Sequence, residues 1–423
     1  MATRPPAVRI DDLADPQFPP HIAEMLGAIA PIAAEIRLEP EPLLAQACVA
    51  TGLSDFGDDA FRERLDVLCR ALREEAGLSP MGKVSSQSQL VKLLSNRLLI
   101  EDLVARHPEI RDVEIAQPII IAGLPRTGTT HLHNLIAADP AMRSLPYWES
   151  LEPVLPAAEQ PAPGEPDPRL ARTAQGLAFL DETVPYFKRM HEMTVDHVHE
   201  EIHLLAIDFS TMLFETMAVM PTWRDYYKAH DQTPSYRYLR KVLQVLQWQR
   251  GGDRWILKSP QHLEQFGPLT TVFPDATFVI THRDPVSITA SLATMISYTA
   301  RTSTEHVDPP KIGRYWAGRI EDKLRACMRD RHVLPADRSI DVRFDEFMAD
   351  DVAMVERIYK LANQPFTRDV RDAMDAFMLE HPRGLHGGVI YDLEGDFGID
   401  PAERRAAMRD YSQQFDVADE YPA

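Results

Sequence analysis

The sequence predicts an α/β fold in which a P-loop-like parallel sheet is flanked by helices. Short runs rich in apolar residues at positions 118–122, 254–257, 276–280 and 339–343 alternate with helical stretches along the chain. The first and third runs are apolar almost throughout, as is typical of strands buried on both faces of a parallel sheet. Because the first run begins at a proline and ends at Gly123, we place the first core strand there.

The composition is that of a globular protein with an acidic surface. The chain has 423 residues, of which 44% are hydrophobic and 26% charged, and its formal net charge is −19 with histidine neutral. This balance argues against nucleic acid and anionic membranes as partners, because both require a broad basic face. We therefore expect any anionic ligand to be held by a few local cations.

The cysteines and the N-terminus indicate where the protein works. Cys48, Cys69 and Cys327 are widely spaced, which suggests neither a disulfide framework nor a cysteine-based zinc site. The N-terminus has no apolar signal core, and no stretch reaches the ~20 apolar residues of a membrane-spanning helix. We expect a cytoplasmic protein without a membrane span, and the oligomeric state is left open.

Two helical regions accompany the predicted sheet. Residues 1–115 are expected to form a helical N-terminal extension, most clearly over 88–105, where apolar residues recur at spacings of three and four. The α/β domain is expected at residues 116–423. It contains an insertion at about residues 150–250, which opens with a proline-rich loop and continues as helices, including a core helix over 204–220.

The stretch from Gly123 to Thr130, GLPRTGTT, has the features of a phosphate-binding loop. It stands between the first strand and a predicted helix over residues 131–138, so that its glycines allow a tight turn and the backbone N–H groups at the helix start can cradle a phosphate. Thr129 replaces the lysine of the NTP-binding pattern G-x-x-x-x-G-K-[ST], which favours a nucleotide with one 5′ phosphate over ATP or GTP. A glycine-rich turn without a ligand is the alternative.

Two separate blocks of sequence resemble the nucleotide-dependent sulfotransferases, particularly their larger bacterial members. The first block is the loop at 123–130, and the second comprises WILKSPQH at 255–262, FPDA at 273–276 and THRDP at 281–285, continued to Ser291. The resemblance extends over about residues 118–415. It implies 3′-phosphoadenylyl sulfate (PAPS) as the sulfate donor, a hydroxylated acceptor and a transfer that requires no metal.

The resemblance assigns nucleotide-binding roles to residues of both blocks. Arg283 and Ser291 would bind the 3′ phosphate, since Ser291 lies two turns along the following helix on the same side as Arg283. Phe344 would lie near the adenine, and Arg383 would belong to a glycine-rich segment that closes over the 3′ phosphate. The alternatives are an ion pair of Arg283 with Asp284 and core packing for Phe344. The 5′ phosphosulfate would be held by Arg126, Thr127, Gly128, Thr129 and Thr130.

The catalytic residues are expected at the carboxyl ends of the strands. Sulfuryl transfer to an alcohol needs in-line alignment, cations on the departing oxygens and a base for the acceptor proton. We expect Arg126 and Lys258 to supply the cations and His262 to act as the general base. Glu200 and Glu201 are the rival bases, within the insertion that we expect to form the acceptor site. A buried salt bridge is the alternative for Lys258, and capping or packing of a helix is the alternative for His262.

The predicted acceptor is a small, partly apolar molecule that carries a hydroxyl group. The insertion offers apolar side chains as pocket walls, namely Phe179, Tyr186, Phe187, Met190, Phe209, Met212, Phe214 and Met217. A P-loop nucleotide kinase or NTPase, or a nucleotide-binding protein without catalysis, stays open as an alternative.

A third class of function is suggested by residues 199–203, which read HEEIH. This is the zinc-protease pattern H-E-x-x-H, which requires both histidines on one face of a helix. The glycine and third histidine of the longer pattern are missing, with Ala206 and Phe209 in their places, and no third ligand is evident. We therefore keep a metalloprotease only as the last alternative.

Overall fold

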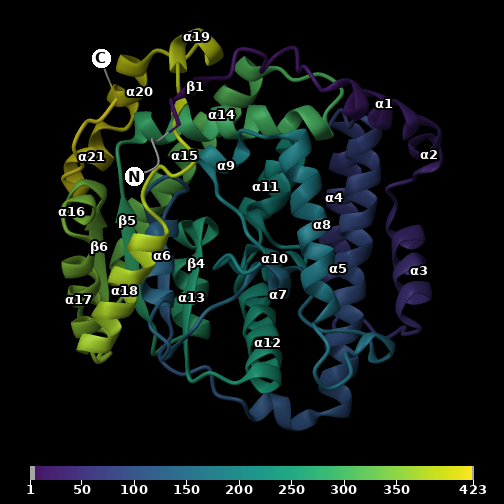
Figure 1. Ribbon diagram of the computed structural model, residues 1–423, viewed down its shortest axis with the longest axis horizontal. Helices are drawn as coiled ribbons and strands as arrows, with labels where there is room; N and C mark the ends of the chain where they lie inside the picture. The colour runs from purple at the N-terminus through teal and green to yellow at the C-terminus, as the bar shows by residue number, and fades with distance from the viewer. Residues whose placement is uncertain (1–4, 422–423) are drawn as a thin grey trace.

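A five-stranded parallel sheet lies at the centre of the fold, as the sequence predicts (Figure 1). The computed structural model describes residues 5–421. The strands are β2 (Ile119–Ala122), β3 (Met142–Arg143), β4 (Arg254–Ser259), β5 (Thr277–His282) and β6 (Ser339–Arg343), in the spatial order β3-β4-β2-β5-β6. All neighbouring strands are parallel. After β2 the chain forms β3 and β4 on one side of it, and then β5 and β6 on the other side. The connections therefore run in opposite directions from β2.

The central strands are buried on both faces because their side chains alternate between two cores. Ile120 packs into one core, whereas Ile119 and Ile121 pack into the other. The same alternation holds in β4 and β5. This is the physical reason for the uninterrupted apolar runs in the sequence.

Helices cover both faces of the sheet. One core contains residues of α6 (Thr129–Ala137), α17 (Asp351–Leu361) and α18 (Arg368–Glu380). The other core contains residues of α12 (Thr233–Arg250), α13 (Phe266–Val272), α14 (Pro285–Ser303) and α15 (Pro309–Asp330). The remaining elements after β4 are short, namely η4 (Pro260–Glu264), η5 (Arg331–Val333), η6 (Ala336–Arg338), α16 (Phe344–Ala349), α19 (Leu393–Phe397), α20 (Pro401–Ala407) and α21 (Arg409–Phe415).

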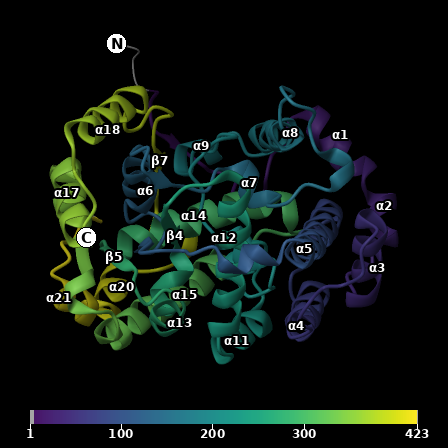
Figure 2. The same ribbon diagram turned by 90° about the horizontal axis from the view of Figure 1, so that it is seen from below.

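The N-terminal helices lie at the opposite end of the molecule from α17 and α18 in both views (Figures 1 and 2). They are α1 (Pro20–Ala28), α2 (Ala30–Glu35), α3 (Pro40–Thr51), α4 (Phe61–Glu74), α5 (Pro80–Arg106) and η1 (Pro108–Asp112). Apolar residues of α4 and α5 share one continuous core with the sheet. The boundary between extension and domain near residue 115 stays a prediction.

A second, two-stranded sheet joins the two ends of the chain, which the sequence did not indicate. β1 (Val8–Arg9) pairs in parallel with β7 (Val389–Ile390). Strands of two residues are too short to produce a pattern that can be recognised in a sequence. As a result, the first described residues are fastened to a segment near the C-terminus.

The insertion contains several short helices instead of the predicted core helix over 204–220. Its elements are α7 (Tyr147–Leu151), η2 (Ala157–Glu159), α8 (Pro168–Thr183), α9 (Phe187–Met190), α10 (Ile202–Ala206), η3 (Met212–Thr216) and α11 (Pro221–Ala229). The chain turns between α10 and η3, where Phe209 has a φ of 52°. This turn brings the Asp208 carboxylate to the buried guanidinium groups of Arg64 and Arg97, at 2.6 and 2.9 Å. The prediction of one helix was wrong because the spacing of apolar residues contains no information on a buried ion pair with residues far away in the chain.

Within residues 5–421, no helix is both long enough and apolar enough to cross a membrane. Residues 1–4, which contributed to the expectation that the chain lacks a signal core, lie outside the described residues.

Candidate active site

A cavity of about 610 Å³ opens at the carboxyl edge of the parallel sheet. Its lining includes Arg126, which follows β2, Arg283, which follows β5, and Phe344, which follows β6. Parallel sheets bind their ligands at this edge, next to the strand at which the connections diverge. The cavity therefore lies where the fold favours a ligand site.

The loop after β2 has the backbone conformation of an anion cradle. Arg126 and Gly128 have φ angles of 73° and 82°, so left-handed residues alternate with Thr127 between them. Such alternation turns successive backbone N–H groups toward one point. Gly128 precedes α6, and no side chain caps the N-terminus of that helix. The first N–H groups of α6 are therefore not used by a side-chain cap.

Gly123 is required by a close contact, and Gly128 is favoured by its positive φ together with a tight contact. A Cβ atom on Gly123 would lie 1.8 Å from Thr281 Oγ1, and one on Gly128 would lie 3.2 Å from the Phe344 ring. Thr127 is buried, and its hydroxyl group lies 2.7 Å from both the Leu124 carbonyl oxygen and Thr281 Oγ1. Thr127 therefore supports the loop from inside, whereas Thr129 and Thr130 line the cavity.

Four of the predicted nucleotide-binding residues contact one another. Arg126 Nε donates to Ser291 Oγ at 2.8 Å, and the same guanidinium group donates to the Met190 carbonyl. Arg283 donates to the backbone carbonyl of Arg126 at 2.6 Å, and its guanidinium carbon lies 3.9 Å from the centroid of the Phe344 ring. The two sequence blocks therefore meet at one site, and Phe344 forms part of the cavity wall.

The C-terminal tail supplies a carboxylate to Arg283. Arg283 Nε donates to both carboxylate oxygens of Glu420 at 3.0 Å, and Nη2 donates to one of them at 2.7 Å. Asp284, the alternative partner of Arg283, instead caps α14 through the N–H groups of Val286 and Ser287. Arg283 therefore already holds an anion, although a different one from the predicted phosphate.

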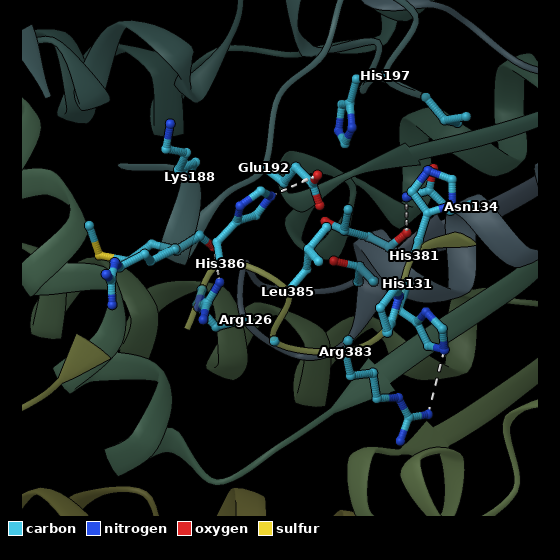
Figure 3. A pocket seen from close by; sticks show the side chains of 18 of the residues that line it. Arg126, His131, Asn134, Lys188, Glu192, His197, His381, Arg383, Leu385 and His386 are labelled. Carbon is cyan, nitrogen blue, oxygen red and sulfur yellow. Dashed lines mark hydrogen bonds and ion pairs between the residues drawn. The ribbon is translucent and has the colours of Figure 1, made fainter. Parts of the chain in front are cut away.

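Residues 382–387 form a wall of the cavity together with residues of the insertion. Arg383 donates to Asp351 at 2.7 Å. The His386 ring lies 2.9 Å from Glu192, as Figure 3 shows. Gly387 has a φ of 81°, and a Cβ atom there would lie 2.8 Å from the Pro5 carbonyl oxygen. The predicted glycine-rich segment thus lies against the cavity and is held by contacts on both sides.

The predicted catalytic residues Lys258 on β4 and His262 on η4 belong to a buried network. The Lys258 side chain is 1% exposed and forms an ion pair with Glu200. The backbone N–H of Lys258 donates to Glu201 Oε2 at 2.9 Å, and Glu201 Oε1 accepts from His262 Nε2 at 2.5 Å. The hydroxyl group of Tyr236 lies 2.8 Å from His262 Nδ1 and donates to it. The salt bridge that was the alternative for Lys258 is therefore present.

This network leaves His262 no free nitrogen for an acceptor. Its ring is fully buried between Glu201 and Tyr236, and it does not line the cavity. Glu201 is equally buried, whereas the Glu200 side chain is 17% exposed. The geometry argues against His262 as the general base and gives it a packing role, in which it holds Glu201 against β4.

Four histidines of the insertion form a cluster beside the cavity, and only His199 and His203 had a role suggested by the sequence, as zinc ligands. The ring centroids are 5.5 Å apart for His191 and His197, 5.9 Å for His197 and His199, and 4.6 Å for His199 and His203. His197 lines the cavity. The available signal was their density, four histidines within 13 residues, but their spacing does not match one helix face.

The HEEIH stretch does not form the helix that a zinc protease requires. His199 lies in an extended segment, and α10 begins only at Ile202. Glu200 and Glu201 are bound to Lys258 and His262. In the part of the chain that the structure describes, no three histidine, cysteine or carboxylate side chains are grouped so that they could hold a metal ion.

The predicted apolar pocket walls do not surround this cavity. Of the eight candidates only Met190 lines it, because Phe209, Met212 and Phe214 are buried in the core. The insertion instead contributes a mainly polar wall of Lys188, Arg189, Glu192, Thr194, Asp196 and His197. Apart from Met190, the eight residues therefore do not form the wall of this cavity, and the nature of the acceptor stays a prediction.

The chain is similar to known sulfotransferases in sequence and in fold. The sequence model of the Sulfotransferase family matches residues 118–368. Sulfotransferase STF1 from Mycobacterium tuberculosis H37Rv is 29% identical, with a TM-score of 0.76, and the match covers 87% of this chain and 97% of that one. Sulfotransferase STF9 from Mycobacterium avium is 25% identical, with a TM-score of 0.80 and coverage of 91% and 98%. No curated protein matches the chain.

Proposed function

The chain belongs to the sulfotransferase family, and we propose that it transfers a sulfuryl group from PAPS to a hydroxyl group of a small molecule. The observation that carries the donor assignment is the loop after β2, in which Arg126 and Gly128 have positive φ angles and the following helix has no side-chain cap. Arg126 of this loop and Arg283 line the same cavity. Because the chain belongs to this family, we no longer consider a kinase, an NTPase or a metalloprotease.

The described residues fit a donor with two separate phosphate positions. The backbone N–H groups of Thr129 and Thr130 would bind the 5′ phosphosulfate together with the Arg126 side chain, which in this structure donates to Ser291 and to the Met190 carbonyl. Arg283 and Ser291 would hold the 3′ phosphate, which would replace the Glu420 carboxylate on Arg283. The other residues carried over from the resemblance keep supporting roles: Thr127 and Gly128 shape the loop, Phe344 offers a ring face to the adenine, and Arg383 lies in the cavity wall.

We assign the transfer two assisting cations, of which Arg126 lines the cavity and Lys258 does not. When bound, PAPS would supply a sulfuryl group already attached to a good leaving group. Arg126 and Lys258 would stabilise the charge that develops on the bridging oxygen. Glu200 orients the Lys258 ammonium group, and Glu201 holds the backbone of the same residue. His262 supports Glu201, so that all three act by positioning Lys258.

The acceptor we propose is small, carries a hydroxyl group and is more polar than the sequence suggested. The wall that the insertion contributes contains charged and hydroxyl side chains together with Met190 and Val198. We also propose a cytoplasmic location, which the free cysteines Cys48, Cys69 and Cys327 support. A protein with a net charge of −19 is a poor partner for nucleic acid.

Calorimetric titration with 3′-phosphoadenosine 5′-phosphate (PAP) tests the donor assignment. We expect the wild-type protein to bind PAP and Arg283→Ala to bind it about 10- to 100-fold more weakly, because charged hydrogen bonds to the phosphate are lost. Arg329→Ala is the matched control, since this arginine is 69% exposed and lies outside the cavity. Absence of wild-type binding would overturn the proposed function.

A further inference from the structure

His197 presents a free imidazole to the cavity. It lines the cavity, and Figure 3 shows its ring directed inward from the side opposite Arg383. Neither of its ring nitrogens has a hydrogen-bond partner within residues 5–421. By contrast, the rings of His131 and His386, which line the same cavity, lie 2.9 Å from carboxylate oxygens. His197 is therefore available to a ligand in a way that these two are not.

The position of the His197 ring is set by its backbone and by its neighbours. Its N–H donates to the Thr194 carbonyl at 3.2 Å, and its carbonyl accepts from the N–H of Tyr147, the first residue of α7, at 2.9 Å. The rings of His191 and His199 flank it with centroids 5.5 and 5.9 Å away. These contacts hold the imidazole at the cavity without using its nitrogens.

The environment keeps His197 uncharged at neutral pH. Burial, and secondarily the positive charge of Lys258, lower its pKa to about 4. Burial also lowers the pKa of His191 well below its ordinary value, with further contributions from His197, Lys258 and Arg126. Lys258 therefore lowers the pKa of both histidines, and Arg126 lowers that of His191. These are the two cations that we assign to the leaving oxygen. An uncharged imidazole in this position has a free lone pair that can take up a proton, although its lowered pKa makes it a weaker base than an ordinary histidine.

We infer that His197 is the general base of the transfer, and this inference rests on the proposed function. The acceptor oxygen forms its bond to sulfur while its proton passes to a ring nitrogen of His197. The bond between sulfur and the bridging phosphate oxygen breaks, and its electron pair stays on the phosphate of PAP, beside Arg126 and Lys258. The imidazolium then releases the proton to water. The base thus comes from the inserted segment, whereas the cations come from the sheet.

The test uses water as the acceptor, because it needs no knowledge of the natural substrate. The rate at which PAPS is converted to PAP and sulfate is measured for wild type and for His197→Gln, whose amide cannot take up the proton. We expect a loss of about 100-fold or more, the range found for removal of a general base. PAP affinity measured by calorimetry should stay within twofold of wild type.

His203→Gln is the matched control, since this histidine belongs to the same cluster but does not line the cavity. Its rate should stay within threefold of wild type, and His197→Asn should repeat the loss if His197→Gln does not fold. An undiminished rate in both His197 variants would overturn the inference, as would a loss of PAP affinity equal to the loss of rate. A wild-type protein that binds PAP but does not accelerate this reaction would also overturn it. Failure to bind PAP at all would instead overturn the proposed function.

Discussion

Substitution of His262 separates a structural role from a catalytic one. In His262→Ala, Glu201 loses the ring N–H that lies 2.5 Å away, and the Tyr236 hydroxyl loses its acceptor at 2.8 Å. In His262→Gln, the side-chain amide can donate to Glu201 and accept from Tyr236, but it cannot act as a base at neutral pH. The two variants therefore differ in packing and are alike in lacking a titratable nitrogen.

The size of the effect follows from the burial of this network. The side chains of His262 and Glu201 are 0% and 1% exposed. A buried hydrogen bond to a charged group contributes about 1.5–3 kcal/mol, and leaving a buried hydroxyl group unsatisfied costs about 1–3 kcal/mol. We therefore expect His262→Ala to lower the free energy of unfolding by about 3–5 kcal/mol, and His262→Gln to lower it by less than about 2 kcal/mol.

Urea denaturation and the rate of sulfate release from PAPS, measured on the same preparations, decide between the roles. If His262 only positions Glu201, His262→Gln should keep most of the wild-type rate and His262→Ala should lose rate together with stability. Equal loss of activity in both variants, with the stability of His262→Gln preserved, would refute this reasoning and return the catalytic role to His262.

Further outcomes follow from charges near the cavity and in the core. Lys258→Met should lower the rate of sulfate release by about 100-fold or more while PAP affinity changes much less, as single-turnover kinetics and calorimetry can measure. Glu420→Gln should raise PAP affinity about two- to fivefold, because a partly exposed carboxylate no longer competes for Arg283; equal or weaker affinity would contradict the contact. Burial acts to raise the pKa of Glu264, but two cations of α15 lower it to about 2. The stability that Glu264 contributes is therefore lost as pH falls from about 4.5 toward 2, so urea midpoints should decline over this range, and decline less steeply in Glu264→Gln.

The parts of the site that depend on local sequence were predictable. The loop after β2 was recognised from its own residues, because two glycines and two adjoining threonines stand between a short apolar strand and a predicted helix. The strand at 339–343 was predicted with the observed bounds. In each case the residues that set the conformation are close together in the chain.

Features that depend on distant partners were not predictable. The burial of both His262 ring nitrogens depends on Tyr236 and Glu201, which reach it from 26 and 61 residues away. The exposure of His197 to the cavity depends on how the insertion folds over the sheet, and the contact between Arg283 and Glu420 spans 137 residues. Residue type and spacing carry no information on such pairings. A histidine whose ring nitrogens are hydrogen-bonded therefore cannot be told from one whose nitrogens are not.

The pairing of β1 with β7 bears on the order in which the protein can be completed during synthesis. Val8 leaves the ribosome early, but its partner Val389 is made 381 residues later. Closing so large a loop carries an entropic cost, which is repaid only once the intervening domain has brought the two segments together. Gly387, beside β7, lines the cavity. This wall of the cavity is therefore expected to form late, so a nascent chain that already contains the folded sheet would not yet enclose the nucleotide that we propose.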